Sequence, residues 1–199
     1  MKKVFLLLLI GSAALGVSAQ NVSKESISQK RHEISVGVGI FNDVQLASAL
    51  GDLMAMTVTG GYLVEPGAYH AFSPNVNYRY WFTNRFGLGG SYVFDTNSVK
   101  IRKDGSSGSS FDEYTRYYST IAIEGVLNYV TKSTWQLYGL LGGGLSIASV
   151  PKSDVLNTVV FPNFQVTPIG VRIGGSFGGF AEVGYGYKGI INVGISVRF

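Results

Sequence analysis

The sequence contains no cysteine among its 199 residues, which excludes disulfide bonds, thiolate catalysis and a lipid-modified N-terminal cysteine. Charged residues make up only 14% of the chain, against roughly 25% in an average soluble domain. The net charge is +4, of which Lys2 and Lys3 in the expected leader supply two units, and no basic run accompanies it. The composition therefore does not indicate nucleic-acid binding.

Beyond its first residues the chain also lacks a long hydrophobic run, whereas a transmembrane helix needs about 20 apolar residues. The one apolar run near the start follows two lysines and leads into Val17-Ser18-Ala19. A short apolar run with these flanks is typical of a secretory signal peptide. We therefore predict a signal peptide over residues 1–19 and a flexible polar lead-in over residues 20–31.

What the remaining chain does have is alternation. In Ile190–Phe199, apolar side chains at the odd positions alternate with mostly polar or small residues at the even positions, the period of a strand with two unlike faces. The same pattern recurs seven times upstream, at about 32–41, 71–82, from 86 to beyond 95, 113–131, 135–150, 164–175 and 179–187. Long and short connections alternate between these segments, except that the last connection should be long and is short. Residues 151–163 are expected to be one of the long loops.

Eight such strands predict an all-β fold over residues 32–199, an eight-stranded antiparallel up-and-down transmembrane β-barrel. The apolar face would meet lipid and the polar face would fill the interior. The connection after the first strand carries apolar residues at helical spacing, which favours a short amphipathic helix near residues 44–56 in the first external loop, capped by Asn42 or Asp43. Pro168 interrupts the sixth strand and predicts a bulge, because a closed barrel has no free edge for proline.

Charged residues recur on the polar faces of six strands. An eight-stranded barrel encloses only enough space for side chains, so these charges must find partners there. We predict an interior salt-bridge network of three acids and three bases, Glu33, Glu124, Glu182, Arg79, Arg172 and Arg198. Closure of the barrel brings the first strand beside the last, which predicts a pair between Glu33 and Arg198.

Aromatic residues gather near the predicted strand ends. Two bands of aromatic side chains at the bilayer interfaces are typical of membrane barrels. The predicted girdle residues are Phe82, Phe86, Tyr129, Trp135, Tyr185 and Tyr187.

The sequence shows no catalytic motif, metal-binding cluster or phosphate-binding loop, so no enzyme activity, metal or cofactor is predicted. His70, Ser73 and Asp95 can be combined into a His, Ser and acid set, but their spacing matches no motif.

The leader, the eight alternating segments, the interior Glu and Arg residues and the terminal Val197-Arg198-Phe199 together resemble the OmpA/OmpX-like family of small outer-membrane β-barrels. The resemblance implies an outer-membrane location, contact with outer-membrane lipids and lipopolysaccharide, and Phe199 as a signal for the barrel assembly machinery. It also implies a structural or surface-interaction role through the external loops. Three alternatives remain open: a lipid A-modifying outer-membrane enzyme, a narrow gated pore, and a soluble periplasmic lipid-binding barrel with its apolar face inward.

Overall fold

The computed structural model describes residues 30–59, 64–65, 72–102, 111–152 and 155–199. One helix and nine strands are present in this part of the chain. They are β1 (His32–Ile40), α2 (Asp43–Thr59), β2 (Val64–Glu65), β3 (Phe72–Trp81), β4 (Phe86–Arg102), β5 (Phe111–Thr131), β6 (Trp135–Lys152), β7 (Val155–Gly174), β8 (Phe177–Gly186) and β9 (Ile191–Arg198).

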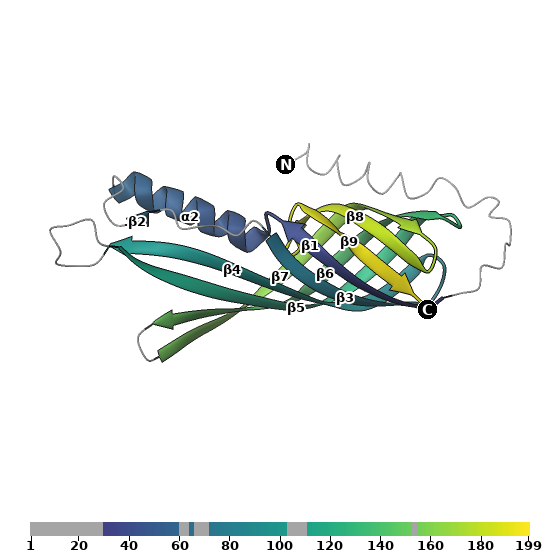
Figure 1. Ribbon diagram of the computed structural model, residues 1–199, viewed down its shortest axis with the longest axis horizontal. Coiled ribbons are helices and arrows are strands. Elements are labelled where there is room, and N and C mark those ends of the chain that lie inside the picture. Colours follow the sequence, from purple (N-terminus) through teal and green to yellow (C-terminus); the bar gives the residue numbers. More distant parts are fainter. Residues whose placement is uncertain (1–29, 60–63, 66–71, 103–110, 153–154) are drawn as a thin grey trace, which may run out of the picture.

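Eight of the strands close into an antiparallel barrel, as the alternation predicts (Figure 1). The order around the barrel is β4-β3-β1-β9-β8-β7-β6-β5, and pairing of β4 with β5 completes the circle. The first and last strands meet through reciprocal backbone hydrogen bonds between His32 and Phe199, each 3.0 Å long. The remaining strand, β2, lies outside the closed barrel and pairs with residues 100–101 of β4.

The two ends of the barrel differ. At one end, which we call the turn end, short turns join β3 to β4, β5 to β6 and β7 to β8, and Phe199 lies there too. At the other end, which we call the extended end, β4 to β7 run on well past their neighbours. These four strands contain 17 to 21 residues, whereas β1, β3, β8 and β9 contain 8 to 10. We call the parts of β4 to β7 that run past their neighbours the extension. In Figure 1 the extension and α2 lie on the left and the turn end lies on the right.

The prediction of a long loop over residues 151–163 is wrong, because most of this segment belongs to β6 and β7. Pro162 lies where β7 is paired only with β6. A strand with one neighbour needs only half of its backbone groups for pairing, so it tolerates Pro162. The bulge expected at Pro168 is confirmed by register shifts on both sides of β7 at this level.

The helix predicted in the first long connection is present as α2. Its first turn is capped by Asn42, whose Oδ1 accepts a hydrogen bond from the Gln45 backbone N–H (2.8 Å), while Gln45 Oε1 accepts one from the Asn42 N–H (3.1 Å). This reciprocal capping box satisfies two backbone donors that a helix start leaves open. Within the described residues, none of the helical structure combines the length and apolarity needed to cross a bilayer.

Alternation along the strands sorts the side chains as expected for a membrane barrel. The outward-facing Val36, Val193 and Ile195 are 43–53% exposed, whereas the inward-facing Glu124 and Ser196 are at most 1% exposed. A soluble lipid-binding barrel with an apolar interior is therefore contradicted, because the valines and isoleucines of β1 and β9 point away from the barrel axis.

Candidate functional site

The polar lumen is built around three buried carboxylates, of which Glu33 lies nearest the turn end. Its Oε2 accepts hydrogen bonds from Arg198 Nε and from the Trp81 indole N–H (3.3 Å), and its Oε1 lies 3.5 Å from Arg79. The predicted pair between Glu33 and Arg198 is present. It joins β1 to β9 at the register Glu33↔Arg198, so closure of the barrel creates the contact.

Glu182 and Arg79 form the middle layer. Arg79 Nη2 lies 2.9 Å from Glu182 Oε1, which also accepts a 2.8 Å hydrogen bond from the Tyr138 hydroxyl. Asn192 Nδ2 donates to the other carboxylate oxygen at 2.7 Å. Arg79 also stacks over the Tyr138 ring, 5.4 Å from its centroid. Arg79 and Glu182 are each 3% exposed or less, so the cost of removing their charges from water is offset by these hydrogen bonds and by the ion pair itself.

Glu124 forms the layer nearest the extended end. Lys188 Nζ lies 2.6 Å from its Oε1, the Tyr187 hydroxyl donates to the same oxygen at 2.9 Å, and Arg79 lies 3.8 Å from its Oε2. Lys188 and Tyr187 come from the turn between β8 and β9, which folds into the barrel. Gly142 on β6 provides the space, since a Cβ there would lie 2.1 Å from the Tyr187 hydroxyl.

Arg172 is held mainly by backbone and hydroxyl acceptors. Its Nε donates to Ser196 Oγ (2.7 Å), and its two Nη atoms donate to the carbonyls of Gly174 and Gly175 (2.9 Å each). Its distance to Glu33 is 4.0 Å. The structure thus brings all six predicted charges into one set of contacts, in which Glu33 is the carboxylate that Arg172 approaches.

Tyr187 is wrong as a girdle residue. It is 1% exposed and bonds to Glu124 inside the barrel. The strand alternation on which the prediction depended ends at Gly186, whose φ of 135° turns the chain inward. The other five girdle candidates lie on the outer surface and are 40–50% exposed, namely Phe82, Phe86, Tyr129, Trp135 and Tyr185.

At the extended end, the start of α2 is fastened to the barrel mouth by the same residues that cap it. Asn42 Nδ2 and Gln45 Nε2 each donate to Ser73 Oγ (2.9 and 3.1 Å) and to the Asp95 carboxylate (2.8 and 3.1 Å). Next to them, burial raises the pKa of the Asp43 carboxyl above its ordinary value. Ser73 and Asp95 therefore serve to anchor the helix, and His70 lies outside the described residues.

Between α2 and the inner faces of β5 to β7 lies an open cleft of about 460 Å³. Its lining is mixed, with apolar and ionic side chains that include Val44, Phe161, Asp52 and Arg116. Further along α2 the apolar side chains of Leu50, Leu53, Met54 and Val58 are 54–86% exposed.

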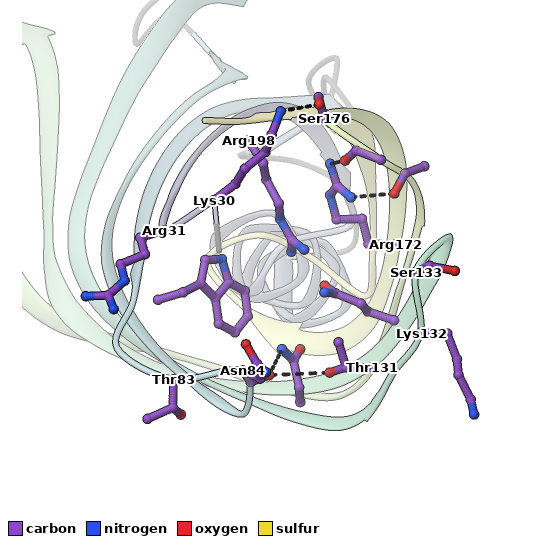
Figure 2. Close-up of a pocket in the computed structure, with 15 residues that line it drawn as sticks. Lys30, Arg31, Thr83, Asn84, Thr131, Lys132, Ser133, Arg172, Ser176 and Arg198 are labelled. Carbon is purple, nitrogen blue, oxygen red and sulfur yellow. Dashed lines mark hydrogen bonds between the residues drawn. The ribbon is translucent and has the colours of Figure 1, made fainter. Parts of the chain in front are cut away.

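At the turn end the lumen opens into a cavity of about 290 Å³ (Figure 2). The charged side chains among its lining residues are all basic: Lys30, Arg31, Lys132, Arg172 and Arg198. Figure 2 shows Arg198 reaching toward the centre of the mouth and Lys30 bonded to Ser176, whereas Arg31 and Lys132 point away.

Sequence reasoning missed Lys188, which the structure buries completely. A lysine followed by glycine after the end of a strand reads as a solvated turn, and only the inward fold of this turn reveals its role. It also missed the inward position of Tyr138, although alternation places this residue on the polar face of its strand. A tyrosine among inward glycines was the one available signal.

No family model and no curated protein matches the sequence. Solved structures similar in fold include the N-terminal β-barrel domain of OprF from Pseudomonas aeruginosa, at 13% identity and a TM-score of 0.45 over 86% of this chain and 98% of that one. They also include Ail, the attachment invasion locus protein of Yersinia pestis, in complex with the heparin analogue sucrose octasulfate, at 16% identity and a TM-score of 0.41 over 84% and 95% of the two chains.

A closed eight-stranded antiparallel barrel with an apolar outer band, aromatic side chains near its strand ends and an ionic interior is the architecture of a small outer-membrane β-barrel. The chain thus has the fold of the OmpA/OmpX-like barrels that its sequence resembles.

Proposed function

We propose that this protein is an integral outer-membrane barrel whose lumen is filled by side chains and whose extended end binds a partner outside the cell. The observation that carries the first half is the sorting of side chains, with Val193 and Ile195 exposed and Glu124 and Glu182 buried. A surrounding of water would favour charged side chains outside and apolar side chains inside. A surrounding of hydrocarbon favours the apolar exterior and ionic interior seen here. The turn end then faces the periplasm, since short turns are typical of that side.

The second half of the proposal is supported by the open edges of the extension. β7 pairs with β8 only from Gln165 onward, so in the described chain Val155–Phe161 has a strand neighbour on one side only, namely β6. Thr158, Val159 and Val160 on this edge are exposed. An uncharged strand edge offers backbone groups to an added strand and apolar side chains to a partner surface.

The proposal includes three further roles. Residues 1–19 act as a cleaved export signal, Phe199 is recognised by the barrel assembly machinery, and the outer band contacts outer-membrane lipids and lipopolysaccharide. Phe199 is 57% exposed at the turn end and stacks on His32, with 5.5 Å between the ring centroids, so it is accessible from outside the barrel.

The absence of cysteine allows a direct test of the topology. Single-cysteine variants Thr158→Cys, on the extension, and Thr83→Cys, on the turn end, are treated on intact cells with a membrane-impermeant maleimide. We expect labelling of Thr158→Cys in intact cells and of Thr83→Cys only after the cells are opened. Equal labelling in intact cells would contradict the orientation.

The same pair of variants tests the binding role. A benzophenone maleimide attached at Thr158→Cys should give crosslinked products on exposure to host or neighbouring cells, and the Thr83→Cys control should not. If the two positions behave alike, the extension is not a binding surface. The gated-pore alternative is tested separately by planar-bilayer conductance of the wild type and Arg172→Ala, and conductance by the wild type would contradict a filled lumen.

A further inference from the structure

The cavity at the turn end has a surplus of positive charge. Glu33 is the only carboxylate within 4.0 Å of Arg172 or Arg198 among the described residues, and it also neutralises part of the charge on Arg79. Lys30 stands on the same rim and bonds to a neutral hydroxyl, Ser176. One shared carboxylate therefore faces two guanidinium groups and one ammonium group.

The donors of these groups are not equally occupied. Arg172 uses all three of its nitrogens on Ser196, Gly174 and Gly175, so it contributes charge but few free donors. Arg198 bonds through Nε to Glu33, and its two Nη atoms make no hydrogen bond to the residues that the structure describes. Figure 2 places this guanidinium at the centre of the mouth, where it points into the cavity.

The wall behind Arg198 is aromatic. Its guanidinium lies 5.1 Å from the centroid of the Trp81 ring, which fixes the plane of the guanidinium. Polar uncharged residues complete the lining, among them Asn84, Thr131 and Gln136. A fixed guanidinium with two free donors is suited to bidentate binding of a tetrahedral or planar oxyanion.

From this geometry we propose that the turn-end mouth is a binding site for a small organic phosphate, with Arg198 as the bidentate donor and Lys30 and Arg172 as charge partners. The surplus of more than one positive charge favours a dianionic phosphate over a single carboxylate. The cavity of about 290 Å³ holds a phosphate and a small organic group against Trp81, and it is small for a peptide segment. The site lies at the end of the barrel opposite to the extension and is independent of the binding role proposed for it.

The two tryptophans of the chain make the site measurable. Trp135 lies on the outer surface, 40% exposed, so the substitution Trp135→Phe leaves Trp81 as the sole indole reporter at the cavity. The full chain with this substitution is refolded in neutral detergent and titrated with phenyl phosphate, at an ionic strength held constant with sodium chloride. We expect a saturable change in Trp81 fluorescence, and its absence would overturn the proposal.

Charge variants locate the site. Arg198→Gln should weaken phenyl phosphate binding by tenfold or more, and Lys30→Gln by a smaller factor of roughly three to ten, as expected for loss of a bidentate and of a single charge contact. Arg85→Gln is the matched control, because Arg85 is a base in a turn at the same end that does not line the cavity. Equal effects of Lys30→Gln and Arg85→Gln would indicate only general attraction to a basic rim and would contradict the proposal. Lys30 lies outside the interior ion pairs, so this comparison holds even if Arg198→Gln fails to fold.

Two further titrations test a lipid phosphate and a carboxylate as alternative ligands. If phosphatidic acid in mixed micelles changes Trp81 fluorescence and phenyl phosphate does not, the site binds lipid headgroups and the proposal of a small soluble ligand is wrong. If an acidic peptide binds with Arg198 dependence and both phosphates fail, the site recognises carboxylates and the proposal is likewise wrong.

Discussion

The barrel and its extension are made of the same strands, but the strands have different numbers of neighbours in the two regions. Within the closed barrel each strand has two neighbours, and inward side chains are joined by ion pairs. Beyond the pair Tyr117↔Ser149, toward the extended end, the β4–β5 hairpin is no longer paired with the β6–β7 hairpin. Folding stability is therefore expected to reside in the barrel, and the extension is free to vary in sequence and shape.

The largest expected effect is in the buried ion pairs of the barrel. Glu33→Gln leaves Arg198 and Arg79 without their shared carboxylate and should lower the free energy of unfolding by about 3–5 kcal/mol. The measurement is equilibrium urea unfolding of the refolded protein in lipid vesicles. The comparison is a variant in which an Asn-Gly turn replaces residues 99–114. This turn joins Ser98 to Thr115, which pair directly in β4 and β5. The replacement should change the free energy of unfolding by less than about 1 kcal/mol. A cost below about 1 kcal/mol for Glu33→Gln would mean that the lumen is hydrated.

The second largest expected effect is the cost of adding a charge to the outer surface, which should differ between the barrel and the extension. Val193→Arg places a guanidinium on the lipid-facing side of β9 and should cost about 2–4 kcal/mol if it lies near the bilayer midplane. Thr158→Arg, on the exposed edge of the extension, should stay within about 0.5 kcal/mol. The same vesicle assay measures both, and similar costs at the two sites would contradict the placement of the bilayer around the barrel alone.

The junction between the two regions should respond more weakly. Asn42→Ala removes the cap of α2 together with its contacts to Ser73 and Asp95, at an expected cost of about 1–2 kcal/mol. The loss should appear as faster amide hydrogen exchange in the first turns of α2, with no change in the amides of β1 and β9. Thr57→Ala, near the other end of α2, is the matched control. Faster exchange throughout the barrel would show that the junction is part of its folding unit.

The smallest expected effect concerns pH at the same junction. Burial raises the folded-state pKa of Asp43 above the unfolded value of 3.8, so the folded state binds the proton more tightly. This contribution to stability is fully present below about pH 3.8 and is lost as the pH rises through the folded pKa. Asp43→Asn, which is neutral at every pH, should therefore slow exchange in the first turn of α2 at neutral pH and give no difference from wild type in acid.

The sequence predicted the features that depend on a period of two. The faces of β1 and β9, the six interior charges and the bulge at Pro168 follow from alternation and from the backbone chemistry of proline. Closure predicted the pair between Glu33 and Arg198, but the partners of the other charges did not follow from the sequence. Arg172 and Glu182 lie on the paired strands β7 and β8, yet they are held by different neighbours. Tyr187 and Lys188 were misplaced for a related reason, since both lie past the glycine at which the strand geometry ends.

The uneven strand lengths also place the extension off the barrel axis. Residues Phe111–Arg116 of β5 alone rise about 20 Å beyond the last β5–β6 pair, at roughly 3.3 Å per residue. As a barrel spins within the bilayer plane, such an eccentric arm sweeps a circle around it. The area that the extension of one copy can reach is therefore wider than the footprint of its barrel.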